Sequence, residues 1–209
     1  MTFGLISVSR SWALCLLLLT GSPADAEIVP IPDDQAEASW TVEQVLASLK
    51  EGRQPSVLFE ETIYSSLLSK PLIVRGILHF APPSRLEKEV LEPYRERYVI
   101  EEDRVTFESE RKHMKKIISL EDYPALLSFV EAFRASFTGD AAQLREVYEP
   151  VLKGTRRKWS LLLRPRDQTG KTLVESILFS GSDGHLATIT IQAPDGDRSV
   201  MTLSRGSSQ

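Results

Sequence analysis

Leu72-Ile73-Val74-Arg75-Gly76-Ile77-Leu78-His79-Phe80 is the stretch that decides the fold. The side chains of a strand point alternately to its two faces, so Leu72, Val74, Leu78 and Phe80 share one apolar face. Similar β-rich stretches surround it. We expect strands at 57–64, 72–80, 85–91, 97–100, 104–108, 148–152, 158–164, 173–180, 185–193 and 199–203. Short turns between them, such as Ser182-Asp183-Gly184, indicate antiparallel neighbours.

Apolar residues at helical spacing interrupt the strands at two places. Thr41 and Gln44 form a capping box in front of a helix that runs to about Lys50. A second helix is expected over 122–137, and a short one continues to Leu144. The sum is an α+β fold, in which helices cover one side of a strongly curved antiparallel sheet.

The first 26 residues have the form of a secretory signal peptide that is cleaved off. Arg10 gives a basic start, and the apolar run over 12–19 is shorter than the ~20 residues that a spanning helix needs. Ala24-Asp25-Ala26 is a small-x-small cleavage site, and Cys15, the one cysteine, is removed with the signal. We expect a signal peptide over 1–26, a flexible lead-in over 27–38, a single domain over 39–204 and a disordered tail over 205–209.

The charge of the chain limits the class of partner. The formal net charge of -4 at pH 7 argues against a nucleic-acid partner. Basic residues nevertheless gather in two places, at Arg111, Lys112, Lys115 and Lys116 and at Arg156, Arg157 and Lys158. Two interpretations stay open, because such clusters are either solvated hairpin tips or docking sites for an acidic partner or lipid headgroups.

Motifs of known enzyme classes are missing from the sequence. It has no Gly-x-Ser-x-Gly elbow, no His-Glu-x-x-His pair and no phosphate-binding loop. His79, His113 and His185 are far apart and have no partners at the spacing of metal ligands. We therefore expect a protein that is not an enzyme, with no catalytic residue, no metal and no cofactor. An enzyme would require one of these histidines to meet a carboxylate in a cleft.

The expected strands and helices carry many apolar side chains. The sequence leaves open whether they fill a core or line a cavity. The candidate cavity residues are Phe59, Leu72, Val74, Leu78, Phe80, Leu126, Val130, Phe133, Phe137, Leu161, Leu163, Ile177, Phe179 and Ile189.

Several short motifs occur in an order that is typical of one known family. They are Val57-Leu58-Phe59-Glu60-Glu61, Gly76-Ile77-Leu78-His79-Phe80 followed by Pro83 and Leu86, Tyr98-Val99-Ile100, Val105-Thr106-Phe107 and Asp197-Arg198-Ser199-Val200-Met201. In this order, behind a signal peptide, they resemble the LolA family of periplasmic lipoprotein carriers. The resemblance extends over 40–203 and is especially close to a divergent LolA-related branch.

The resemblance implies a fold and a set of partners. LolA and LolB are incomplete antiparallel β-barrels that helices close around an apolar cavity, which takes the acyl chains of a lipoprotein. On this model the chain is a periplasmic monomer that carries a lipoprotein or another lipid from an inner-membrane transporter, of ABC or RND type, to an outer-membrane acceptor. The alternative is a module like RseB, which uses this fold to sense a partner and transports nothing.

One position departs from the family pattern. LolA proteins carry an Arg-Pro pair after the second strand, and its arginine helps to hold the helical lid shut. The aligned pair here is Pro82-Pro83, so Arg75 or Arg85 is expected to replace that latch.

Overall fold

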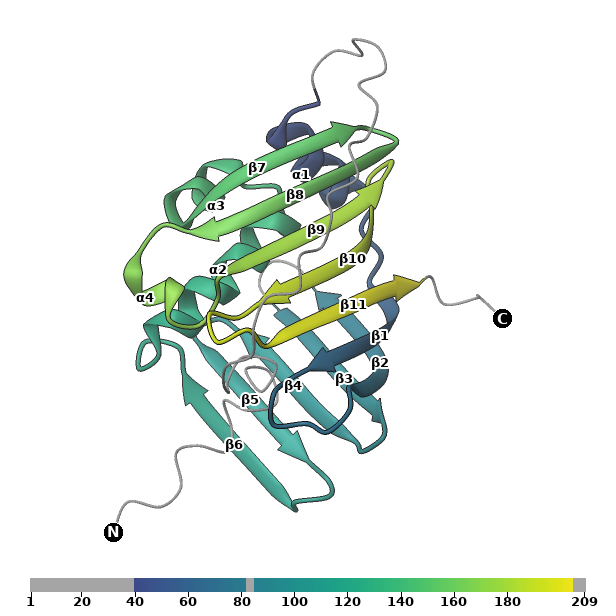
Figure 1. Ribbon diagram of the computed structural model, residues 1–209, viewed down its shortest axis with the longest axis vertical. Coiled ribbons are helices and arrows are strands. Elements are labelled where there is room, and N and C mark those ends of the chain that lie inside the picture. The colour runs from purple at the N-terminus through teal and green to yellow at the C-terminus, as the bar shows by residue number, and fades with distance from the viewer. Residues whose placement is uncertain (1–39, 82–84, 205–209) are drawn as a thin grey trace.

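The computed structural model describes residues 40–81 and 85–204 (Figure 1). The expected signal peptide, lead-in and tail, together with Pro82 and Pro83, lie outside them. The helices of the described residues are α1 (Val42–Glu51), α2 (Pro124–Thr138), α3 (Ala141–Val147) and α4 (Gln168–Lys171). The strands are β1 (Ser56–Tyr64), β2 (Leu72–Ala81), β3 (Arg85–Glu92), β4 (Glu96–Glu101), β5 (Arg104–Ser109), β6 (Met114–Ser119), β7 (Tyr148–Thr155), β8 (Lys158–Pro165), β9 (Ser176–Ser182), β10 (His185–Gln192) and β11 (Arg198–Ser204).

All of these strands belong to one antiparallel sheet, in the order β6-β5-β4-β3-β2-β1-β11-β10-β9-β8-β7. The first six form one meander and the last five form another. The two meanders join where β1 pairs with β11, with Phe59 opposite Leu203 and Glu61 opposite Met201. β6 and β7 are the two ends of the order, so the sheet curves without closing.

The helices bridge the two edges of this sheet. The chain leaves edge strand β6, passes through α2 and α3, and enters the opposite edge strand β7. Figure 1 shows the helices gathered on one side of the curved sheet. The expected α+β fold, an incomplete antiparallel barrel that helices cover, is therefore confirmed.

Local sequence signals explain where the helices start and stop. The capping box of α1 is confirmed, because Thr41 Oγ1 accepts a hydrogen bond from the Gln44 amide at 3.3 Å and Gln44 Oε1 accepts one from the Thr41 amide at 2.9 Å. α2 starts with Pro124, which suits the first turn because its missing N–H has no partner there in any helix. It ends at Gly139, whose φ of 82° lies in the left-handed region that glycine adopts without strain.

Two elements were not expected from the sequence. Strand β6 carries Lys115, Lys116 and an Ile117 that is 60% exposed. Charged residues are common on edge strands, and here they leave too little alternation of apolar and polar residues for the strand to be recognised in the sequence. The single turn of α4 follows Asp167, whose side chain accepts a hydrogen bond from the Gly170 amide. Because α4 occupies 168–171, strand β9 begins at Ser176, three residues later than expected.

The inner face of the sheet and the helices enclose the hydrophobic core. Its largest fully buried side chains include Trp159, Tyr98, Tyr148, Phe107, Phe179, Leu46 and Leu144. The outer face carries ion pairs instead, such as Glu87 between Arg85 at 3.0 Å and Arg97 at 2.6 Å. The alternation along each strand thus separates an apolar inner layer from a charged outer one.

Candidate functional site: an apolar cavity beneath the helices

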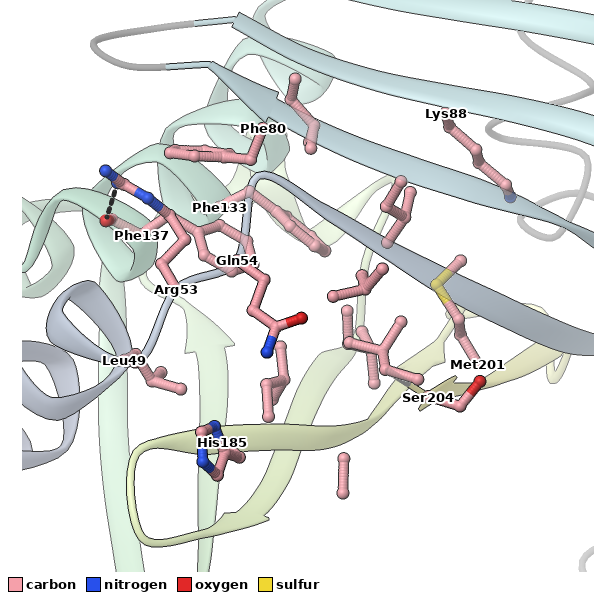
Figure 2. A pocket seen from close by; sticks show the side chains of 18 of the residues that line it. Leu49, Arg53, Gln54, Phe80, Lys88, Phe133, Phe137, His185, Met201 and Ser204 are labelled. Carbon is pink, nitrogen blue, oxygen red and sulfur yellow. Dashed lines mark hydrogen bonds between the residues drawn. The ribbon is translucent and has the colours of Figure 1, made fainter. Parts of the chain in front are cut away.

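A cavity of about 320 Å³ lies between the helices and the inner face of the sheet (Figure 2). This volume is at the lower end of the ~300–1,000 Å³ that is usual for ligand sites. Its lining comes from the end of α1 and the loop after it, from α2, and from β1, β2, β3, β10 and β11. The cavity therefore sits at the junction of the two meanders, and most of its wall is apolar.

Three phenylalanines form the part of the wall next to α2. The ring centres of Phe80 on β2 and Phe137 on α2 are 5.0 Å apart, and those of Phe133 and Phe137 are 6.3 Å apart. Phe133 also meets Phe179 of β9 edge to face, with the ring centres 5.6 Å apart. Aromatic contacts of this kind stabilise packing beyond the area that they bury. They hold α2 against both meanders, so α2 covers the cavity.

The structure brings some of the candidate cavity residues together and separates others. Those that line the cavity are Leu78, Phe80, Phe133, Phe137 and Ile189. Those that lie outside its lining are Phe59, Leu72, Val74, Leu126, Val130, Leu161, Leu163, Ile177 and Phe179. The four of these on β8 and β9 have no exposed surface, because that part of the sheet packs into the solid core. Leu72 is 39% exposed at the start of β2.

The two arginines that were expected to replace the latch lie among carboxylates of strands. Arg75 binds Glu60 at 2.8 Å and Glu92 at 3.3 Å. Arg85 binds Glu87 and Glu101, both at 3.0 Å. These partners belong to β1, β3 and β4, so the described contacts of Arg75 and Arg85 join strands to each other and leave the helices aside.

Arg53, which sequence reasoning missed, makes the contact that a latch requires. Its Nη1 donates a hydrogen bond to the carbonyl oxygen of Phe137 at 3.0 Å, and its guanidinium lies 4.5 Å from the ring centre of Phe80. The last four carbonyls of a helix have no partner within the helix, and a cation there also interacts favourably with the helix dipole. Arg53 thus ties the loop after α1 to the C-terminal turn of α2, within the lining of the cavity (Figure 2).

A second tie joins the same helix to the sheet. Arg134 of α2 donates through Nη2 to the carbonyl oxygen of Glu102, in the turn between β4 and β5, and its Nη1 binds Glu131 at 3.0 Å. Arg53 and Arg134 therefore attach α2 to its surroundings through polar contacts at two separate places.

Polar side chains also enter the cavity wall, at the end away from Arg53. Glu61 on β1 and Lys88 on β3 form an ion pair there, and their side chains are only 4% and 8% exposed. Figure 2 shows Lys88 on the opposite side of the cavity from Arg53 and His185. Ser199 on β11 adds a hydroxyl that is buried in the same lining. Alternation could have revealed all three, because each falls on the inward face of its strand.

The basic clusters lie at two separate ends of the molecule. Arg111 and Lys112 occupy the turn between β5 and β6, whereas Arg156 and Arg157 occupy the turn between β7 and β8 (Figure 1). Several of these cations have partners within the protein. Lys115 binds Glu108 at 2.8 Å, Arg156 lies 3.8 Å from Asp183, and Arg111 lies over the ring of Tyr94. Because the two clusters lie at separate ends (Figure 1), their described residues do not form one continuous basic surface.

The histidines occupy three different elements. On the outer face of the sheet, His79 Nδ1 and Ser56 Oγ share a hydrogen bond of 2.8 Å. The other ring nitrogen of His79, Nε2, lies 3.7 Å from a carboxylate oxygen of Glu89. That last distance is too long for a hydrogen bond, and neither Ser56 nor Glu89 lines the cavity. Within residues 40–81 and 85–204, no group of three His, Cys, Asp or Glu side chains is placed to hold a metal ion.

No helix in the described part of the chain combines the length and the hydropathy that a membrane crossing requires.

The chain matches one family model and several solved structures. Residues 34–209 match the model of a family described as outer membrane lipoprotein carrier protein LolA-like. A search of curated proteins finds no match. Among solved structures, the LolA superfamily protein NE2245 from Nitrosomonas europaea is 11% identical, with a TM-score of 0.40 over 79% of this chain and 92% of that one.

Two further structures are similar at the same level. A putative outer membrane lipoprotein-sorting protein domain from Vibrio parahaemolyticus is 10% identical, with a TM-score of 0.42 over 78% of this chain and 89% of that one. A chain of the Pseudomonas aeruginosa MucA/MucB complex is 13% identical, with a TM-score of 0.39, and the match covers 78% of this chain but only 55% of that one. The family model covers most of the sequence, and the chain therefore belongs to the family of proteins like the outer membrane lipoprotein carrier LolA.

Proposed function

We propose that this protein is a periplasmic carrier, which shields the acyl chains of a lipoprotein or of another lipid during transfer from the inner to the outer membrane. The observation that carries the proposal is the apolar cavity beneath α2, with Phe80, Phe133 and Phe137 in its wall. A transporter in the inner membrane would load the cavity, and an acceptor at the outer membrane would empty it. Membership in the LolA-like family supports the same role.

The energetics explain why such a carrier needs a covered cavity. Transfer of one methylene from an apolar environment to water costs about 0.8 kcal/mol of free energy. Exposing an acyl chain with ~14 methylenes to water therefore costs roughly 11 kcal/mol. A wall of aliphatic and aromatic side chains offsets that cost. Release then requires the wall to open, and α2 is the element whose polar ties, through Arg53 and Arg134, can break without unfolding the sheet.

A transfer assay tests the carrier role against the sensing alternative. Donor vesicles contain a lipid with a pyrene-labelled acyl chain, and acceptor vesicles contain none. A carrier raises the rate of pyrene transfer in proportion to protein concentration, and the Ile191→Trp variant, which narrows the cavity, does not. Saturable binding of the labelled chain without faster transfer would favour a sensing module and would contradict the transport role.

A further inference from the structure

The wall of the cavity holds a buried charged pair, Glu61 and Lys88. The side chains of Glu61 and Lys88 are 4% and 8% exposed, and the ammonium of Lys88 lies 5.2 Å from the ring centre of Phe59. Removing two charges from water costs more than their attraction often returns, and apolar residues of similar volume are frequently as stable in such places. A pair that persists in an apolar wall is therefore better explained by a polar group that it meets.

The geometry of the sheet adds a third polar group to this pair. Glu61 is paired with Met201, and Ser199 lies two residues before Met201 on the same face of β11. Such diagonal neighbours are about 7–8 Å apart across a sheet. Ser199 is 1% exposed, lines the cavity, and its hydroxyl oxygen has no hydrogen-bond partner in the part of the chain that the structure describes. A buried hydroxyl that faces a cavity without a partner is suited to bind a group of the cargo.

The charge balance of the cluster defines the group that it can take. A lysine ammonium is a donor, an ionised carboxylate is an acceptor, and the hydroxyl of Ser199, unpartnered among the described residues, can do both, so the cluster presents donors and acceptors together. The pair is already neutral. An anionic head would have to lie beside Glu61 in a poorly screened site, whereas an uncharged group brings no new charge into the wall.

We propose that Glu61, Lys88 and Ser199 form a subsite for an uncharged group that both donates and accepts hydrogen bonds, such as an amide or a hydroxyl beside the acyl chain. This inference rests on the proposed function, because it assigns the polar end of the cargo to one end of the cavity. The hydrocarbon then extends toward Phe133 and Phe137.

Three ligands of equal chain length test the subsite. Dodecanamide donates and accepts, methyl dodecanoate only accepts, and dodecanoate is an anion. Each displaces the fluorescent probe N-phenyl-1-naphthylamine from the protein. We expect dodecanamide to bind about tenfold more tightly than either of the others, since a hydrogen bond to a charged partner is worth at least that factor.

Variants with matched controls locate the preference. In Glu61→Leu/Lys88→Met, which keeps the wall filled, we expect the tenfold preference for dodecanamide to fall to about threefold or less, while the affinity for methyl dodecanoate stays unchanged. The control Glu60→Leu/Arg75→Met removes an ion pair between β1 and β2 on the opposite face of the sheet, and it keeps the tenfold preference. Ser199→Ala, which removes the buried hydroxyl and leaves the pair in place, should reduce the preference about threefold.

The outcomes separate this inference from the proposed function. If methyl dodecanoate fails to displace the probe, the cavity does not take acyl chains, and both proposals are wrong. If all three ligands bind equally to the unmodified protein, or if dodecanoate binds most tightly, only the subsite for an uncharged group is wrong. A tenfold preference that survives in both the double variant and Ser199→Ala would also overturn it.

Discussion

Arg53 donates a hydrogen bond to the carbonyl oxygen of Phe137 at 3.0 Å, across 84 positions of sequence. The contact joins the loop between α1 and β1 to the last turn of α2, and both residues line the cavity. It satisfies a carbonyl that the helix itself leaves without a partner. The helix that covers the cavity is thus fastened at its C-terminal end by one side chain.

Replacing Arg53 by alanine should loosen that fastening. We expect Arg53→Ala to lower the free energy of unfolding by about 1–2 kcal/mol and to raise the dissociation rate of a bound acyl probe several-fold, because a hydrogen bond from a charged donor is lost. Stopped-flow displacement and urea unfolding measure the two effects. Arg75→Ala is the control, since Arg75 is half exposed and its ion-pair partners among the described residues are carboxylates of strands. Equal dissociation rates in the two variants would contradict the role of Arg53.

Narrowing the cavity should separate binding from stability. Ile191→Trp adds bulk to the lining, so we expect it to weaken acyl-probe binding at least tenfold while the melting temperature changes little. Leu162→Trp makes the same addition on the outward face of β8 and should bind normally. Fluorescence titration and thermal unfolding check both. Unchanged binding in Ile191→Trp would place the acyl chain elsewhere.

The buried pair should respond differently to single and double replacement. Lys88→Met alone leaves the carboxylate of Glu61 in an apolar wall without its lysine, and we expect the free energy of unfolding to fall by about 3 kcal/mol. Glu61→Leu/Lys88→Met removes both charges and should recover most of that loss. Urea unfolding of the two variants gives the comparison. Additive losses, with the double variant less stable than the single one, would show that the two side chains act separately.

An acid titration should reveal the ion pairs of the outer face. The hydrogen bond from Arg97, helped by one from Arg85, holds the pKa of Glu87 below its ordinary value. A lowered pKa in the folded state stabilises the protein above the unfolded pKa of about 4.3 and ceases to do so as the pH falls through the folded value.

Glu87→Gln should therefore lower the free energy of unfolding by about 1 kcal/mol at neutral pH, and it should leave that free energy unchanged below the pKa that Glu87 has in the folded protein. Urea unfolding across that range, with the exposed Glu110→Gln as control, measures the difference. A cost that is the same at neutral and at acid pH would exclude the ion pair as its cause.

Strand alternation and turn chemistry were sufficient to predict most of the strands. The stretch over 72–80 became β2, and the capping box at Thr41 opened α1 as expected. Strand β6 was missed because Lys115 and Lys116 give an edge strand the composition of a loop. The pairing of β1 with β11 also lay beyond local patterns, since strands at opposite ends of the chain meet only when the whole fold forms.

The site was harder to predict than the fold for a physical reason. Inward-facing residues of a strand look alike whether a helix packs on them or a cavity adjoins them, so Leu161 and Leu78 could not be distinguished before the position of α2 was known. Arg53 was missed because its partner, Phe137, lies far away in the sequence. Lys88, by contrast, shares the inward parity of Leu86 and Val90, which was a readable signal.

Binding of an acyl chain inside the protein is the claim on which the account depends, and a direct titration tests it. Purified protein is extracted to remove lipid and titrated with a fluorescent long-chain acyl probe, and the extract is examined by mass spectrometry. We predict saturable binding at one probe per protein molecule, weakened at least tenfold in Ile191→Trp, together with acyl lipid in the extract. An extract without lipid, combined with no saturable binding, would contradict the carrier proposal.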